Sequence, residues 1–513
     1  MRAGGAWVPI AMLAGWQALS SAGVLTYDYL PAPTEIATAL LALAQSGALA
    51  DAAGHTLTVA LAAALIAIVA GGSAGLAVGL SPVLSGHVLA SVDVLRTVPA
   101  VALVPVAVLT LGPTITAELA VAVYAGLWPV LISTAAGVAA VPAGHHDAAR
   151  TLRLRRSQVV RKVVVPAAVP AWLVGARMSA VVALLVAIVA EMLTTPRGLG
   201  GALVESLNAL APQQMWAYVA VCGAIGFLLN ATLRRLGRAA FPAIPLTTGR
   251  DVGVLTEPGL SAPQSAVRGL VPLAALLLAW QVAAPPQSLF WPPPSEWLRA
   301  LTGLVDAGAL LPAAAETVST YVVGLAAAAL CGGLAGVAVG WSRRADRALT
   351  PTLDFLAAVP AAALVPVVVL LLGPGRVAGV VLVAVVVSWP VLLSTATATR
   401  GVPTVRREMA RTLGLSPLGR WLRVVLPSIT PGGLLGLRLA SGLALIVTLL
   451  ADIFGAGGGI GRLLVISQQQ FDAAAAWGLV SVVGAFGYLS SAVIGLIGRR
   501  ALARRGVVDA LSR

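Results

Sequence analysis

Two charged segments stand out in this chain of 513 residues, because each lies between long apolar runs. The later one, Glu408–Pro427, reads EMARTLGLSPLGRWLRVVLP. The earlier one, Asp147–Pro166, reads DAARTLRLRRSQVVRKVVVP and precedes it by 261 positions. Side chains of these types can bind a cytoplasmic partner protein, or they can anchor an ordinary basic loop at a membrane surface. The recurrence of the pattern at the same place in both halves favours partner binding.

Local signals predict that the later segment is a helix–turn–helix elbow. Glu408 is expected to open its first short helix, where the helix dipole favours a carboxylate. Gly414 can take the left-handed conformation that ends a helix. Ser416 and Pro417 then provide the N-cap and first-turn proline of a second helix, and Pro427 marks the entry to the next membrane span.

The sequence contains no HExxH pattern and no clustered Cys/His set of an enzyme active site. An ATP-binding P-loop needs a lysine after its glycines, and the only lysine, Lys162, follows Arg161. ATP, if it is used, must therefore be bound by another polypeptide. The cysteines are interpreted as small core residues and the histidines show no ligand spacing. We therefore expect no metal, cofactor or disulfide at Cys222, Cys331, His55, His87, His145 or His146.

The composition is that of a membrane protein. Hydrophobic residues make up 59% of the chain, charged residues only 10%, and the mean hydropathy is +0.95. The net charge of +14 would suggest nucleic acid binding in a soluble protein, but basic cytoplasmic loops explain it better here. Several charge-free runs reach the roughly 20 residues that a membrane-spanning helix needs. These runs are Thr56–Gly86, Pro99–Ala117, Leu119–His146, Thr317–Ser342, Val377–Thr399 and Ala473–Gly498.

The chain is also a tandem repeat. DVLRTVPAVALVPVAVLTLGP, starting at Asp93, matches DFLAAVPAAALVPVVVLLLGP, starting at Asp354, at 15 of 21 positions. The same offset relates Trp216 to Trp477. We therefore predict an all-α polytopic fold made of two homologous domains, residues 1–245 and 267–513, joined by a cytoplasmic linker at 246–266.

About six spans are expected in each half. In the first half they are predicted near residues 6–25, 56–80, 96–111, 116–137, 168–191 and 214–233. In the second half they are predicted near 269–284, 317–341, 357–372, 377–398, 429–451 and 473–497. The apolar stretch after Arg2 is interpreted as a retained membrane helix rather than a signal peptide, because the second half has a similar run.

Basic residues predict the orientation of these spans. With both termini in the cytoplasm, nearly all arginines fall in inner loops, as the positive-inside rule requires. The outer loops then hold only Arg197, Arg299, Arg376 and Arg462.

Polar residues within spans are candidates for a functional site. Arg177 and Arg438 could attract an anionic substrate, or they could extend to the cytoplasmic surface or pair with a neighbouring element. Glu191 and Asp452 could line an outer gate, although solvated helix ends are the favoured interpretation.

Prolines are expected to kink or break the third span of each half. Such breaks occur where helices pack against protein or line a cavity, so these spans are candidates for a translocation path. The residues are Pro99, Pro105, Pro360 and Pro366.

The later elbow resembles the hallmark of permease subunits of binding-protein-dependent ABC importers, which reads EAA, three residues, G, nine residues, I-x-L-P. Glu408, Ala410, Gly414, Val424 and Leu426–Pro427 fall on this pattern. The stretches PAPTEI, PPPSEW, VPAVALVPV, VPAAALVPV, GLRLASGLAL and ADIFGAGGGIGRLL resemble the nitrate/sulfonate/taurine/bicarbonate type of permease.

This resemblance implies a type I permease fold, with both permease units fused in one chain of the cell membrane. It implies that two ATP-binding subunits in the cytoplasm hold the elbows as coupling helices, and that an external solute-binding protein delivers the substrate. It favours a small anion such as nitrate, a sulfonate or taurine, or else a vitamin precursor. The implied docking residues are Asp147, Ala148, Ala149, Arg150, Leu152, Arg153, Glu408, Ala410, Arg411, Leu413 and Gly414.

The first elbow departs from the family pattern. It has Asp147 for the acidic residue, Arg153 for the glycine and Val165 for the leucine, whereas the second elbow differs at Met409. A non-glycine residue in the left-handed conformation costs about 1–2 kcal/mol, so the first elbow is expected to turn differently. Our hypothesis is that the two docking sites are inequivalent.

Two other functions fit parts of the sequence. A twelve-helix secondary transporter of the major-facilitator type also has two parallel halves, but the repeated elbow and the scarcity of embedded ionisable pairs speak against it. A membrane scaffold without transport activity is the other alternative.

Overall fold

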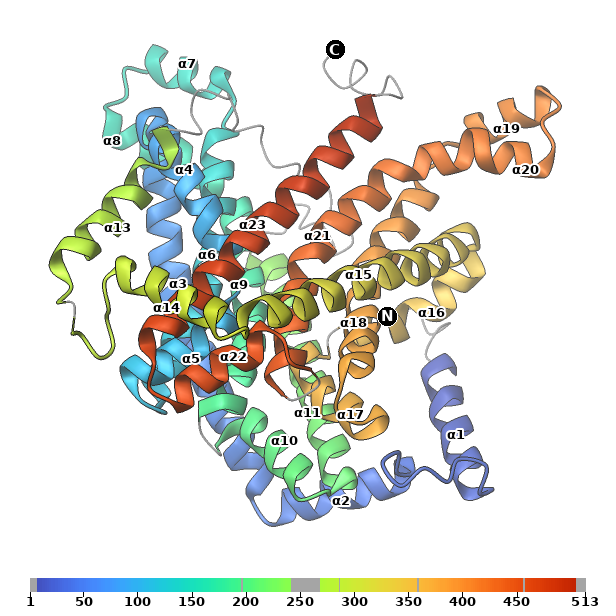
Figure 1. The fold of residues 1–513 in the computed structure, drawn as a ribbon. Coiled ribbons are helices and arrows are strands. Elements are labelled where there is room, and N and C mark those ends of the chain that lie inside the picture. Colours follow the sequence, from blue (N-terminus) through green and yellow to red (C-terminus); the bar gives the residue numbers. More distant parts are fainter. Residues whose placement is uncertain are drawn as a thin grey trace.

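The computed structural model describes residues 7–194, 197–240, 268–285, 287–357, 359–454 and 457–503, and every regular element in these ranges is a helix (Figure 1). The predicted linker at 246–266, both domain boundaries and Arg2 lie outside the described residues. The all-α expectation is confirmed.

The first half begins with α1 (Trp7–Ser21), α2 (Pro33–Gln45), α3 (Ala48–Leu80), α4 (Pro82–Thr97), α5 (Ala100–Leu111) and α6 (Ile115–Ala139). It continues with α7 (Ala143–Thr151), α8 (Arg156–Val159), the π-helical turn η2 (Val160–Val164), α9 (Val165–Thr194), α10 (Gly198–Asn208) and α11 (Pro212–Ala240).

The second half repeats this order. It begins with α13 (Val271–Ala283), α14 (Pro294–Asp306), α15 (Leu310–Trp341), α16 (Arg343–Leu356), α17 (Ala361–Leu372) and α18 (Arg376–Arg400). It continues with α19 (Thr404–Thr412), α20 (Pro417–Arg420), the π-helical turn η4 (Trp421–Val425), α21 (Leu426–Ile453), α22 (Ile460–Gln469) and α23 (Ala473–Ala503).

A helix lies at each of the twelve predicted span positions, but the lengths differ from expectation. Within the described ranges, eight helices are long and apolar enough to cross a membrane: α3, α6, α8–α9, α11, α15, α18, α20–α21 and α23. The helices α1, α5, α13 and α17 have only 12 to 15 residues. Twelve residues rise about 18 Å, against about 30 Å of hydrocarbon. The third predicted span is instead a bent pair in the first half, because α4 and α5 meet at 83°.

Three long helices form the centre of each half, α3 with α6 and α9, and α15 with α18 and α21. Glycines on α3 and α15 allow the close approach. A Cβ atom on Gly75 would lie 2.5 Å from the backbone oxygen of Leu131 in α6, and one on Gly336 would lie 2.6 Å from that of Leu392 in α18. Membrane helices use small residues at their contacts to pack closely, because lipid provides no hydrophobic drive for association.

The two halves are interlocked. The short helix α5 packs against α21, α22 and α23, and its counterpart α17 packs against α9, α10 and α11. The first helices are exchanged, since α1 packs on α16 and α13 packs on α4. Ser91 of α4 joins the second contact, because its hydroxyl donates to the backbone oxygen of Gly269 and accepts from the backbone N–H of Leu273.

The repeat extends to individual contacts. The indole N–H of Trp216 donates to the backbone oxygen of Tyr29, and that of Trp477 donates to the oxygen of Phe290. The two cysteines differ in burial. Cys222 is buried, but Cys331 is exposed on α15, so the expectation of a core position was wrong for it.

We predict that Gly75→Ala lowers the free energy of unfolding by about 1–3 kcal/mol, because the new methyl group meets the backbone of α6. The matched control is Gly54→Ala on the same helix, where a Cβ would meet nothing within 4 Å. The control is expected to leave stability unchanged or raise it by up to about 1 kcal/mol. Thermal unfolding in detergent measures both, and equal melting temperatures would contradict the close-packing argument.

Candidate functional site

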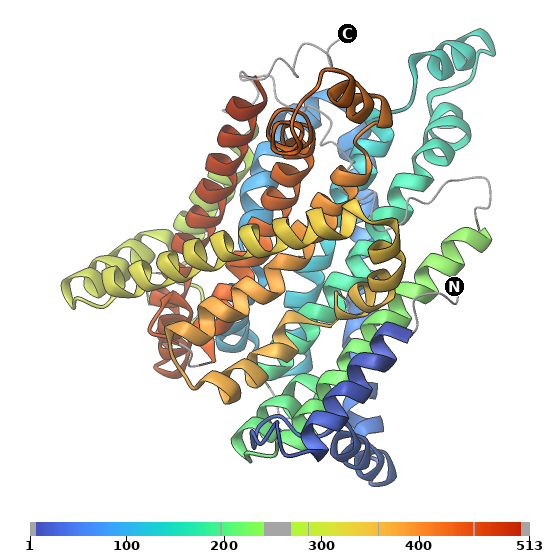
Figure 2. The ribbon, with the colours of Figure 1, turned by 90° about the vertical axis from the view of Figure 1, so that its right-hand side faces the viewer.

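Both elbows lie at the same end of the molecule, as Figures 1 and 2 show, while α2 and α10 lie at the opposite end. The first limb of the second elbow is α19, which begins at Thr404 after Pro403 as the N-cap residue. Glu408 therefore lies in the middle of that helix, and the expectation that it opens the helix was wrong. The preceding proline fixes the start, in the same way that Pro142 precedes α7.

The two elbows turn in the same way. Gly414 has φ +66 as predicted, and Arg153 has φ +49 at the equivalent place. The hydrogen bonds also match, since Leu415 N donates to Ala410 O over 3.2 Å and Leu154 N donates to Ala149 O over 3.0 Å. The expectation of a different first turn was therefore wrong. The hydrogen bonds of the first turn hold Arg153 in the left-handed conformation, which costs a non-glycine residue about 1–2 kcal/mol.

The second limb of each elbow runs into a long central span. Ser416 accepts a hydrogen bond from Gly419 N over 3.1 Å and Pro417 occupies the first turn, as predicted. The π-helical turns η2 and η4 then continue directly into α9 and α21. No loop interrupts the path from either elbow to its central helix.

Burial divides the predicted docking residues into two groups. Ala149 and Ala410 are buried at 2% and 1% exposure, so they hold the first limb against the protein. The other nine predicted docking residues are exposed. Leucines form the tips, with Leu152 at 70% and Leu413 at 68% exposure. Both leucines lie near arginines in the chain, Leu152 between Arg150 and Arg153, and Leu413 after Arg411.

The surroundings of the two elbows differ. Trp341, at the end of α15, packs on Trp421 of η4 with ring centroids 4.7 Å apart. A pocket of about 370 Å³ lies beside this pair and is lined in part by Ala410 and Arg411. The equivalent residues in the first half are Leu80 and Val160. The aromatic contact therefore belongs to the second elbow alone.

The predicted breaks in the third span are present. Pro99 and Pro360 are the N-cap residues of α5 and α17, and Pro105 and Pro366 lie within these helices. All four are buried. Because α5 and α17 form contacts between the two halves, a pathway between the halves would pass beside them, and their role in translocation stays a prediction.

The two arginines within spans are not equivalent. Arg177 donates from Nε to Asn230 Oδ1 of α11 over 3.0 Å and is partly buried, whereas Arg438 is exposed. Of the alternatives open for Arg177, the structure therefore shows pairing with a neighbouring helix.

The acidic residues Glu191 and Asp452 are buried at 0% and 2% exposure, so the favoured interpretation as solvated helix ends was wrong. Near the end of its span, each carboxylate accepts a hydrogen bond from a threonine, and the same arrangement occurs in both halves. Thr317 donates to Asp452 Oδ2 over 2.7 Å and accepts from Ile460 N over 2.8 Å. Thr56 likewise donates to Glu191 and accepts from Leu199 N. The carboxylates and threonines thus fasten the first turns of α10 and α22, whose backbone N–H groups need partners.

Sequence reasoning overlooked this fastening, although a signal for it was present. A threonine, an acidic residue and a glycine-rich stretch recur in both halves at the same offset. The glycines are required, because a Cβ on Gly198 would lie 2.3 Å from the Glu191 carboxyl group and one on Gly459 would lie 2.1 Å from that of Asp452.

Comparison with known proteins gives one family. The family described as binding-protein-dependent transport system inner membrane component matches the chain twice, at residues 63–244 and 324–506. The putative aliphatic sulfonates transport permease protein SsuC of Bacillus subtilis (strain 168) is 29% identical over 46% of this chain and 85% of its own length. The taurine transport system permease protein TauC of Escherichia coli (strain K12) is 30% identical over 45% of this chain and 86% of its own. The nitrate import permease protein NrtB of Leptolyngbya laminosa is 30% identical over 35% and 64%.

We predict that Thr317→Val destabilises the protein by about 1–3 kcal/mol, because it leaves Ile460 N and one Asp452 oxygen without their shared partner. The matched control is Thr58→Val, since the exposed Thr58 hydroxyl bonds only to its own helix. Apparent melting temperatures of the two variants give the comparison. A loss no greater than that of the control would show that the fastening carries no stability.

Proposed function

The chain belongs to the family of binding-protein-dependent transport system inner membrane components, and from this premise we propose that its two elbows dock on separate ATP-binding subunits and drive import of a small anion. It is a fused permease of the ABC importer type, because the family match covers both halves. This membership leaves no support for a major-facilitator transporter. The family is one of transport permeases, not of enzymes.

The observation that carries the docking proposal is the direct connection between exposed elbow tips and central helices. Leu152 and Leu413 project from turns whose second limbs continue into α9 and α21. A force on the tips would therefore tilt the helices that pack at the centre of each half. Two elbows imply two ATP-binding subunits, and we place ATP hydrolysis on them because this sequence has no P-loop.

The substrate and orientation follow by analogy. The relatives are named for aliphatic sulfonates, taurine and nitrate, so we propose a small anion delivered by an extracytoplasmic binding protein. A vitamin precursor is the alternative. Arginine is concentrated at the elbow side of the predicted topology, so we propose that the elbows and both termini face the cytoplasm.

We predict that the chain, co-expressed with the ATP-binding subunits of its host, purifies as a complex that Glu408→Lys weakens. The reversed charge lies on the exposed face of the first limb, beside Met409 and Arg411. The matched control, Glu205→Lys, reverses an exposed carboxylate on α10 at the opposite end. Co-purification and vesicle uptake of labelled nitrate, taurine and aliphatic sulfonates are the measurements. Solute uptake that needs neither ATP nor a second subunit would contradict the proposal.

A separate prediction concerns the inequivalence of the elbows. Because the second elbow is closer to the family pattern and alone has the Trp341–Trp421 contact, Glu408→Lys should reduce transport more than Asp147→Lys does. Transport rates and binding of the ATP-binding subunits are to be measured for each single variant. Equal losses from both would refute the inequivalence while leaving the docking proposal intact.

A further inference from the structure

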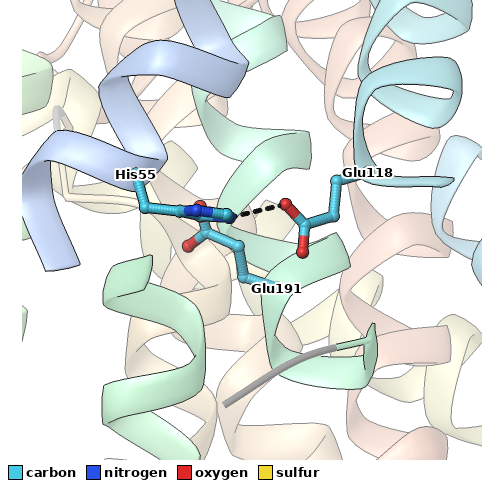
Figure 3. Close-up of side chains that lie close together, drawn as sticks. All are labelled: His55, Glu118 and Glu191. Atoms are coloured by element: carbon cyan, nitrogen blue, oxygen red, sulfur yellow. Dashed lines mark hydrogen bonds and ion pairs between the residues drawn. The ribbon is translucent and has the colours of Figure 1, made fainter. Parts of the chain in front are cut away.

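Three ionisable side chains from distant parts of the first half meet at the end of the spans opposite the elbows. Figure 3 shows the ring of His55 and the carboxyl groups of Glu118 and Glu191 converging from α3, α6 and α9. One ligand atom of each residue lies within 4.8 Å of the other two. The Nε2 atom of His55 is 2.9 Å from Glu118 Oε2.

Neighbouring residues donate hydrogen bonds to one oxygen of each carboxylate and so orient both groups. Thr194 donates to Glu118 Oε1 over 2.8 Å. Glu191 Oε2 accepts from the Thr56 hydroxyl and from Gly200 N, each over 2.9 Å. Donors of this kind fix ligand orientation in metal sites and are as much a part of such sites as the ligands.

One oxygen in the cluster lacks a partner. Both carboxylates are fully buried, and Glu191 Oε1 has no hydrogen bond to any residue that the structure describes. A buried carboxylate oxygen without a partner is costly, and two buried carboxylates add mutual repulsion. A cation would remove both penalties.

We propose that His55, Glu118 and Glu191 bind a divalent transition-metal ion of the Zn²⁺ or Mn²⁺ type. Imidazole nitrogen with carboxylate oxygen is a ligand set that these ions accept. Ligand atoms about 2.1 Å from such an ion lie roughly 3.3–3.5 Å apart. Side-chain rotations therefore have to open the 2.9 Å contact of His55 with Glu118 and bring all three ligand atoms, now within 4.8 Å of one another, to that spacing. The His55 side chain is 17% exposed, so the cluster is not closed off completely.

The second half cannot form the same site. His55 is replaced there by Glu316, and Glu118 by Gly379. A Cβ on Gly379 would lie 3.2 Å from Thr320 Cγ2 and 3.4 Å from Ala451 Cβ, so this position has little room for a ligating side chain. The proposal therefore requires one ion per chain, not two.

Bound metal would brace the three central helices of the first half where they leave the membrane. Glu191 also fastens α10 through Gly200 N, so the ion would stabilise this short helix as well. In the second half the corresponding contact is the Thr317–Asp452 fastening.

The test uses the purified full chain in detergent, carrying a tag without histidine and stripped with EDTA. Zn²⁺ and, separately, Mn²⁺ are added, and bound metal per chain is measured by elemental analysis and titration calorimetry. We expect one tightly bound ion of at least one of the two metals and a raised melting temperature, since a ligand that binds only the folded state stabilises it. Glu118→Gln should weaken binding on the order of 100-fold or more, and Thr194→Val, which removes only an orienting donor, about 10-fold or more.

Two control variants should bind as the unmodified chain does. His87→Gln removes an exposed histidine whose Nδ1 is hydrogen-bonded to Val83 O of its own helix, and Glu316→Gln changes the counterpart of His55. Should Glu118→Gln fail to fold, Thr194→Val still decides the question. Binding of neither metal, or equal binding by the unmodified chain, Glu118→Gln and Thr194→Val, would overturn the proposal.

Discussion

The close contact among three long helices in each half is the constraint on which the other parts of this permease depend. In the first half the continuous helix α8–α9 runs 39 residues, about 58 Å, from the elbow to Thr194, just beyond the buried Glu191. One end presents exposed side chains, and the other is fastened to α3 and α10. Because the glycines of α3 bring the backbone of α6 within contact distance, movement at either end of α9 has to be accommodated by the whole group.

The two halves share a backbone plan and differ in the side chains placed on it. The elbows turn alike although one has arginine at the left-handed position. Only the second carries an aromatic pair behind its elbow, and only the first gathers a histidine with two carboxylates at the far end. Duplication preserved what packing requires, and the two copies diverged at each end of the central helices.

Sequence reasoning succeeded where the determining signals are local. The repeat, the left-handed turn at Gly414 and the cap at Ser416 follow from residues close together in the chain. It failed where distant residues decide. The burial of Glu191 depends on Thr56, 135 positions away, and the His55 cluster depends on contacts across 63 positions. The third span was overestimated because the charge-free run from Pro99 to Ala117 is longer than its helix, α5, which ends at Leu111. Arg153 was misjudged because the hydrogen bonds of its turn outweigh its local preference.

The exchange of the first helices bears on assembly. The second half provides α13, which packs on α4 of the first half, and the first half provides α1, which packs on α16 of the second half. Each half therefore covers a helix of the other. A half translated alone would leave α4 or α16 without the helix that covers it in the whole chain. Covalent fusion supplies the two divergent units in equal numbers and, by raising the local concentration of each for the other, favours their pairing over pairing with a second copy.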